Sequence, residues 1–275
     1  MANIEVQNLF TLARRARDAG DNATAGKYYE QILLYDPNDF EAVFYSGYCA
    51  AACTIIRDID SAAIRLKNTF NAAAPLAQQQ LDDPTDALYA MCDDTCNLLA
   101  NLSDAAYNHY MQYSTVNGAL SEYQQRVYQC GMAAMAIGDF FYRIGDKRVA
   151  CLSYKKGIAF WKGQYTPNDV ALNRIKEYEP TYEPPKKAGC YVATCVYGSY
   201  DCPQVWTLRR YRDNTLHKTW YGRAFIRLYY AVSPTLVKWF GETNWFKKLW
   251  KGRLDKMVKK LNEEGVEDTA YDDLY

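Results

Sequence analysis

The sequence predicts an all-α protein in which a helical array precedes a small, mainly helical C-terminal domain. Apolar residues recur at intervals of three and four residues over most of the chain, as on one face of a helix, and the pattern breaks at Gly or Pro. No segment alternates between polar and apolar residues for long enough to indicate a β-sheet. A group of residues near the start also recurs later with the same spacing, which is typical of stacked helix pairs.

The first helix pair is predicted between Val6 and Asp39. Small residues would let two antiparallel helices cross closely, a glycine would form the turn, and a proline would end the second helix. The residues in these roles are Ala13, Ala25, Gly20 and Pro37, with Tyr29 filling the groove between the helices. Over these residues the segment resembles a tetratricopeptide repeat, which implies a stack of helix pairs with a concave surface for a peptide or protein.

A second unit is predicted at residues 131–164. The run from Gly145 to Tyr154 repeats the Gly, Asp, Ala and Tyr of the run from Gly20 to Tyr29 at identical spacing. Further helices without this pattern are expected at residues 40–74, 85–102 and 103–116 and from residue 121 onward. Because one helix pair cannot bury its apolar faces alone, we expect these helices to stack.

Proline marks a linker between two domains. Residues 178–187 read YEPTYEPPKK, and each proline restricts the residue before it to extended conformations. The sequence therefore predicts a tetratricopeptide-like array at residues 1–178, a proline-rich linker at 179–188, and a basic C-terminal domain with an acidic tail at 189–275.

Composition excludes several classes of protein. A chain of 275 residues with 49% hydrophobic and 23% charged side chains is neither disordered nor collagen-like. No apolar run reaches the length of about eighteen residues that a bilayer requires, and the start does not resemble a signal peptide, so we expect a cytoplasmic location and no transmembrane segment. Nine cysteines without a dense framework suit reduced thiols better than a disulfide scaffold.

The charges are balanced overall but segregated along the chain. Residues 201–260 hold fourteen Lys and Arg against four Asp and Glu, a net charge of +10, whereas the last thirteen residues carry six acidic side chains and no basic one. This arrangement predicts either a negatively charged partner or a tail that shields the basic block. The lysines that a folded-back tail would cover are Lys247, Lys248, Lys251, Lys259 and Lys260.

The C-terminal domain carries a second resemblance. Its stretches CYVATCVYGS, VWTLRRYRD and WYGRAFIRLYYAVSPTLVKWFG, from Cys190 to about Gly241, are similar to the CFI-box C-terminal domain found at the ends of many bacterial proteins. The resemblance implies a compact module and little about activity. The opening run CYVATCVYG is the only part with a strand-like composition.

The domain contains residue types that serve two kinds of chemistry. The weak candidates for a metal site are Cys190, Cys195, Cys202 and His217, which lack the paired spacing of a zinc site. A nucleophilic alternative uses Cys190 as the thiolate, His217 as the base, and Asp213 or Asp201 to orient it. The favoured interpretation is that these residues are structural, and no cofactor is expected.

A basic amphipathic helix is predicted at residues 244–261. Its apolar stripe either packs on the core or attaches to an anionic membrane surface or an acidic protein groove. Nucleic acid is a less favoured partner because the chain has no recognised binding motif and a pI of about 6.7.

The sequence thus favours an interaction protein over an enzyme. The array is expected to bind a protein or peptide through residues on the first helices of its pairs, namely Asn8, Arg15 and Asn22. The C-terminal domain is expected to bind through Tyr197, Arg209, Arg210, Arg212, Arg223, Trp245, Lys248, Trp250 and Lys251. A cysteine-dependent enzyme and a peripheral membrane protein are the alternatives.

Overall fold

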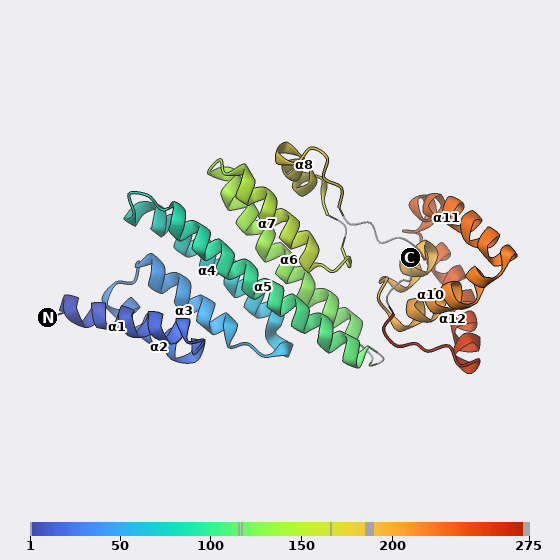
Figure 1. The fold of residues 1–275 in the computed structure, drawn as a ribbon, viewed down its shortest axis with the longest axis horizontal. Helices are drawn as coiled ribbons and strands as arrows, with labels where there is room; N and C mark the ends of the chain where they lie inside the picture. The colour runs from blue at the N-terminus through green and yellow to red at the C-terminus, as the bar shows by residue number, and fades with distance from the viewer. Residues whose placement is uncertain (1, 115, 117, 166, 185–189, 272–275) are drawn as a thin grey trace. The chain divides into compact units, whose positions relative to one another are not determined.

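All regular secondary structure in the computed structural model is helical (Figure 1). The structure describes residues 2–114, 116, 118–165, 167–184 and 190–271, and these residues contain no β-strand, so the predicted all-α class is confirmed. The α-helices are α1 (Ala2–Asp18), α2 (Asn22–Tyr35), α3 (Phe40–Ala52), α4 (Ile59–Gln80), α5 (Thr85–Tyr113), α6 (Ala119–Arg143), α7 (Lys147–Phe160), α8 (Asp169–Tyr178), α9 (Tyr191–Tyr197), α10 (Pro203–Asn214), α11 (Trp220–Phe240) and α12 (Asn244–Glu263). Two short 3₁₀ helices are η1 (Ile56–Asp58) and η2 (Leu216–Lys218).

The chain divides into two compact units. The first is built from residues 1–109 and 121–184, and the second from residues 110–120 and 185–275. The end of α5 and the start of α6 thus group with the second unit, where the Tyr110 hydroxyl donates a hydrogen bond of 2.8 Å to the Asp201 carbonyl oxygen. Each unit has its own apolar core. Part of the proposed linker, residues 185–188, lies outside the described residues.

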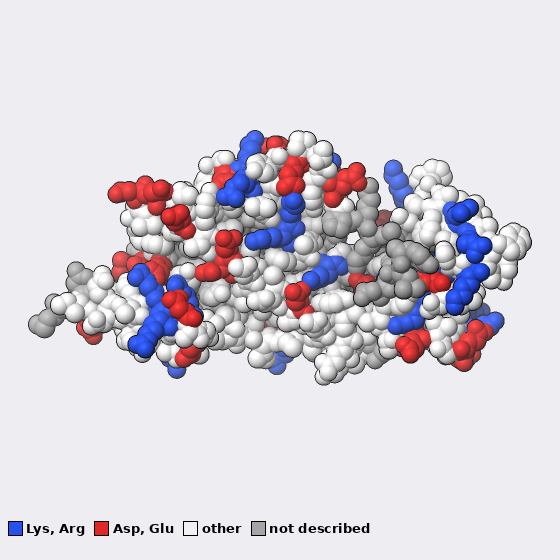
Figure 2. All heavy atoms as spheres, in the orientation of Figure 1, with Lys and Arg blue, Asp and Glu red and all other residues white. Residues whose placement is uncertain are grey.

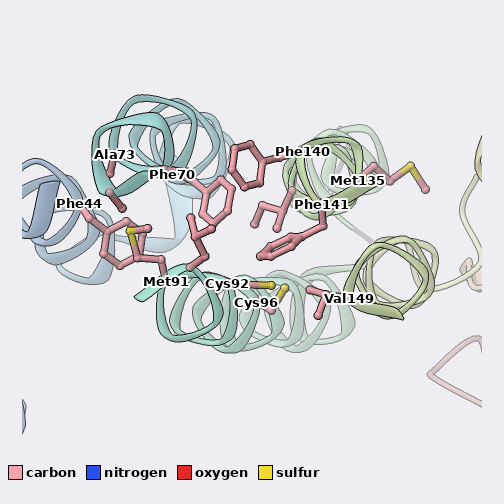
Figure 3. Packing of buried hydrophobic residues seen from close by; sticks show 14 of the residues in the cluster. Phe44, Phe70, Ala73, Met91, Cys92, Cys96, Met135, Phe140, Phe141 and Val149 are labelled. Carbon is pink, nitrogen blue, oxygen red and sulfur yellow. The ribbon is translucent and has the colours of Figure 1, made fainter. Parts of the chain in front are cut away.

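The core of the first unit is formed by residues from all of its helices, α1 to α8. Figure 3 shows Phe70 of α4 and Phe140 of α6 pointing toward one another, and their ring centres lie 5.4 Å apart in an edge-to-face arrangement. Phe44 and Met91 extend the same cluster into α3 and α5. Burying each such side chain stabilises the fold by about 1.5–3 kcal/mol, so the stacked helices depend on contacts between neighbours.

The two predicted repeat units share one turn structure. Gly20 and Gly145 both have positive φ angles, of 79° and 89°, which favour glycine. In each turn the glycine N–H bonds the carbonyl three residues earlier, and the next N–H, that of Asp21 or Asp146, bonds the carbonyl five residues earlier. Each aspartate then caps the following helix by accepting a 3.0 Å bond from the N–H three residues on. The repeated residues therefore form the same local structure, while membership of the tetratricopeptide family stays a prediction.

The repeated tyrosines are buried and each meets a pair of opposite charges. The Tyr29 hydroxyl donates to Glu41 Oε1 at 3.3 Å, and Glu41 pairs with Arg14. The equivalent Tyr154 hydroxyl donates to Asp139 Oδ1 at 2.6 Å, and Asp139 pairs with Arg174. Burial is the main cause that raises the pKa of both tyrosines, so both hydroxyls stay protonated. In both repeat units the charge pair joins the first helix of the unit to the helix that follows its second helix. These helices are α1 and α3 in one unit and α6 and α8 in the other.

The strand-like run after residue 189 is helical, which corrects the expectation of extended structure. It forms α9, which starts after Cys190 in a left-handed conformation with a φ of 51° and ends at Gly198 with a φ of 74°. Val192 and Ala193 are buried on one face of this short helix. Strand preference depends on a partner strand, and the described residues offer none, so helical packing decides the outcome.

One helix boundary differs from expectation and another agrees. Residues 85–102 and 103–116 were expected as separate helices, but α5 runs through Ser103, whose hydroxyl donates to the Phe160 carbonyl at 2.8 Å. Within residues 40–74, residues 40–52 were expected as the first helix of a further unit, and α3 has this range.

We expect larger side chains at the two repeated alanines to destabilise the first unit. Ala25 is fully buried and Ala150 is 1% exposed, so Ala25→Leu and Ala150→Leu should each lower the free energy of unfolding by about 1–3 kcal/mol through overpacking. Chemical denaturation followed by circular dichroism would measure the change.

The matched controls are Ala23→Leu and Ala159→Leu, because both alanines are exposed on the same two helices. These variants should stay within about 0.5 kcal/mol of the parent. Equal stability of buried and exposed variants would contradict the close helix crossing.

Candidate functional site

An apolar pocket lies within the C-terminal unit, enclosed by α9, α10, α11 and α12. Its volume is about 290 Å³. Its apolar walls are made mainly by Val192, Ala193, Leu208, Leu216, Phe225, Ile226, Trp250, Leu254 and Met257. Tyrosines and Arg212 supply the few polar atoms nearby, so the pocket suits a ligand with a large apolar part.

The short helix α9 is held in place by bonds to two neighbouring helices. The Val192 N–H donates to the Tyr229 hydroxyl of α11 at 3.1 Å, and the Tyr197 hydroxyl donates to Asp255 of α12 at 2.8 Å. Lys251 pairs with the same Asp255 at 3.2 Å. Tyr197, which was predicted to contact a partner, therefore joins α9 to α12, while Lys251 pairs within α12 and lies 5.2 Å from the Tyr197 ring centre.

Two arginines of α10 that were predicted to contact a partner are instead paired inside the unit. The Arg209 side chain is 3% exposed, pairs with Asp201 at 3.4 Å, and lies 4.1 Å from the ring centre of Tyr200. Arg212 donates two hydrogen bonds to Asp213 and one of 2.7 Å to the Tyr230 hydroxyl of α11. A guanidinium can satisfy several acceptors at once, which explains why arginines hold this small unit together.

The C-terminal tail crosses α10 and is fastened by Arg210. Its guanidinium donates to the backbone carbonyl oxygens of Glu267, Thr269 and Ala270 at 3.0, 2.5 and 2.8 Å. Tyr271 continues this contact, with its hydroxyl 3.1 Å from Asp213 Oδ2. The tail was expected to cover the lysines of the amphipathic helix.

The lysines that the tail was expected to cover divide between the tail and other partners. Lys247 pairs with Glu242 and Lys251 with Asp255, whereas Lys259 and Lys260 pair with Glu263 and Glu264 at the start of the tail. From residue 267 to residue 270 the backbone carbonyls of the tail bind Arg210 of α10, so this part of the tail contacts an arginine that was not among the expected lysines. Asp272 and Asp273 lie outside the described residues.

The cysteines of this unit have separate surroundings. Cys190 lines the pocket, the Cys195 thiol lies 3.3 Å from the Gly241 carbonyl oxygen, and the Cys202 thiol lies 3.5 Å from that of Ser199. Burial raises the pKa of Cys195 and raises that of Cys202 to about 11, so both thiols are protonated at neutral pH. Among the described residues, no group of three or more His, Cys, Asp and Glu side chains could hold a metal.

The two carboxylates named in the nucleophilic alternative both bind arginines of α10. Asp213 accepts hydrogen bonds from Arg212 and Tyr271, and Asp201 pairs with Arg209 at 3.4 Å. His217 lies in η2, where its backbone carbonyl accepts a 3.1 Å bond from Arg223. These contacts favour a structural role for Asp213 and Asp201, while the roles of Cys190 and His217 stay predictions.

The surface of α11 is a feature that the sequence analysis missed. Of its 21 residues, only Gly222 and Ser233 are buried, although the helix is rich in aromatic and aliphatic side chains. The large apolar side chains that it exposes are Trp220, Tyr221, Phe225, Leu228, Val232, Trp239 and Phe240. The signal in the sequence is the absence of acidic residues from a stretch so rich in apolar ones.

The predicted stripe of α12 is divided between core and solvent. Phe246, Val258 and Leu261 are buried, whereas Trp245 is 57% exposed, and Trp250 lines the pocket. Lys248 is exposed. Figure 2 shows several Lys and Arg side chains on the visible face of this unit. No helix in the described part of the chain has the length and apolar character needed to span a membrane.

In the first unit, the predicted contact residues lie on two helices. Asn8 and Arg15 are exposed on α1, but Asn22 starts α2 and its amide oxygen accepts a long contact of 3.8 Å from the Cys49 thiol. Asn22 is therefore on the second helix of its pair, not on the first. An open groove of about 490 Å³ lies instead between α3 and α4, lined by Val43, Ser61, Ile64, Arg65, Asn68, Thr69 and Ala72.

We expect Arg210→Gln to destabilise the C-terminal unit. Glutamine is too short to reach the carbonyls of the tail, so the variant should lower the free energy of unfolding by about 1–3 kcal/mol. Hydrogen exchange should also show faster exchange of the backbone amides at residues 266–271.

Arg223→Gln is the control, because Arg223 is exposed and bonds one carbonyl, that of His217. It should change stability by less than about 0.5 kcal/mol. Unchanged exchange in the tail of Arg210→Gln would show that the arginine does not hold it.

Comparison with known proteins assigns no function to the chain, so the function proposed below is argued from the geometry. No family model, no curated protein and no solved structure matches the chain. The resemblances to the tetratricopeptide repeat and to the CFI-box domain stay predictions from the sequence.

Proposed function

We propose that this protein is a non-enzymatic interaction adaptor, with a helical array that binds a protein or peptide and a C-terminal unit that binds an anionic membrane surface. The observation that carries the proposal is the exposed face of α11. Large apolar patches on a protein surface mark contacts with another molecule, and here basic residues lie on the same helix.

The exposed apolar residues of α11 form one continuous stripe. Successive residues of a helix are rotated by about 100°, which places Tyr221, Phe225, Leu228, Val232 and Trp239 within a narrow arc. The side chains that line the pocket occupy the neighbouring arc. The stripe thus borders the pocket face of the helix, and Phe225 lies at the shared edge because it is exposed and also lines the pocket.

Basic side chains occupy the other edge of the exposed half of α11. These basic residues are Arg223, Arg227 and Lys238. Their long aliphatic side chains can lie along an apolar surface while the charged groups stay in water. Trp220 and Trp239, 76% and 68% exposed, lie near the two ends of the helix. Tryptophan beside basic residues suits the boundary between lipid headgroups and acyl chains, which favours a membrane surface over an acidic protein.

Cosedimentation with vesicles tests this arm of the proposal. The full chain should bind vesicles in proportion to their content of anionic lipid, and binding should weaken with salt because each Lys or Arg near the surface contributes about 1 kcal/mol. The double variant Leu228→Ser and Trp239→Ser should weaken binding at least about tenfold, since it removes apolar contacts outside the pocket.

A matched control is Leu34→Ser with Ile55→Ser, two exposed apolar residues of the first unit. It should bind within about twofold of the parent. If the parent does not bind anionic vesicles at low salt, the membrane arm is wrong and the stripe contacts a protein instead.

The groove between α3 and α4 supports the other arm. Ser61, Arg65 and Asn68 lie along one side of α4, at spacings that share a helix face, and all three are exposed. The Asn68 amide can both donate to and accept from a peptide backbone, and Arg65 can bind a carboxylate. An open groove with these groups suits an extended peptide.

Selection from a displayed library of random peptides tests the array. Peptides that bind the full chain should lose affinity about tenfold or more for Arg65→Glu or Asn68→Ala. Arg15→Glu serves as the control on α1. Peptides sensitive to Arg15→Glu alone would place the site where the sequence predicted it, and the absence of any selected peptide would contradict this arm.

A further inference from the structure

The pocket of the C-terminal unit is not needed for either contact proposed above. We propose that it binds the hydrocarbon chain of an anionic amphiphile, of which a long-chain carboxylate is the simplest example. The inference rests on the size, lining, access and surrounding charge of the pocket, and it does not depend on binding to vesicles or peptides.

The size and lining of the pocket favour a hydrocarbon. Its volume of about 290 Å³ is close to the lower end of ligand pockets, which begin at about 300 Å³. An engineered apolar cavity of about 150 Å³ in another protein stays dry and binds benzene, so a larger space between aliphatic and aromatic walls has little affinity for water. Leu208, Ile226 and Leu254 form such walls here.

Access to the pocket is provided by residues that are partly exposed. Phe225 is 56% exposed and Met257 is 38% exposed, and both also line the pocket. The mouth therefore lies where α11 and α12 present these side chains. A flexible chain can enter there, and the adaptable Met257 side chain can fit it.

Positive charge near the pocket favours an anionic headgroup. The Arg253 guanidinium lies 5.7 Å from the ring centre of Trp250, a wall residue, whereas the charge of Arg212, also in the wall, is paired with Asp213. Residues 201–271 hold fourteen basic and eight acidic side chains, so the net charge of this part of the unit is +6. A carboxylate outside the mouth would thus lie in a favourable potential while its chain fills the pocket.

Calorimetric titration with straight-chain carboxylates tests the proposal. At concentrations that avoid micelles, the Kd should fall about fourfold for each added methylene, equal to about 0.8 kcal/mol, and should level off once the pocket is full. The matching methyl esters should bind more weakly at low salt, and the difference should shrink as salt is added. An affinity that does not depend on chain length would overturn the proposal.

Two tryptophan substitutions on α11 separate the pocket from the exposed stripe. Ile226→Trp should fill the pocket and weaken binding about tenfold or more, whereas Leu228→Trp, two residues away on the exposed face, should leave the Kd within about twofold. Arg253→Gln should weaken binding of the carboxylate but not of the ester. Equal binding by both tryptophan variants would show adsorption to the surface and overturn the proposal.

A thiol measurement on the parent protein keeps the test valid if Ile226→Trp fails to fold. Cys190 lines the pocket, and Cys53 is exposed in the first unit. A saturating carboxylate should slow the reaction of Cys190 with a small thiol reagent at least about fivefold and leave that of Cys53 unchanged, because only Cys190 is covered. Equal rates at Cys190 with and without the carboxylate would overturn the proposal, as would equal slowing at both cysteines.

Discussion

The buried tyrosine hydroxyls set the constraint on which the first unit depends. Each must find a partner away from water, and in both repeated turns the partner is a carboxylate that is itself paired with an arginine. Arg14 and Asp139 occupy equivalent positions on the first helices of the two repeat units. The first helix therefore carries the basic residue of the pair in one unit and the acidic residue in the other. A shift of one helix against the next would leave a buried hydroxyl without its acceptor, which helps to specify the register of the helices.

The same requirement decides which charges of the C-terminal unit are available to a partner. Arg209, Arg210 and Arg212 on α10 satisfy carboxylates and backbone carbonyls inside the unit. A small core gains less from apolar burial, so guanidinium groups that each bond several acceptors contribute a larger share of its cohesion. The positive charge left at the surface comes mainly from α11 and α12, beside the exposed aromatic side chains.

The features that the sequence predicted well, namely the repeated turns, the helix caps and the helices, are determined by residues close together in the chain. The positive φ at Gly20 and Gly145 and the caps at Asp21 and Asp146 depend on neighbours within five residues, and the helices follow from periodicity. The helical state of α9, the internal pairing of the α10 arginines and the pocket depend on residues far along the chain. Tyr229 is 37 residues from the Val192 N–H that it binds, and the tail carbonyls are almost 60 residues from Arg210. Composition cannot distinguish an arginine that binds a partner from one that binds its own chain.

Helix α11 connects the two proposed activities of the C-terminal unit. Ile226 and Tyr229 face the pocket while Leu228 faces outward, so one short stretch contributes to both. A helix with only two buried residues gains little stability from its own packing, and a chain bound in the pocket would add apolar contacts along its inner side. A ligand stabilises the state it binds by an amount that grows with the logarithm of its concentration. Occupancy of the pocket would therefore order the same helix that presents the exposed stripe, and by reciprocity a surface that holds α11 in this conformation would strengthen binding in the pocket.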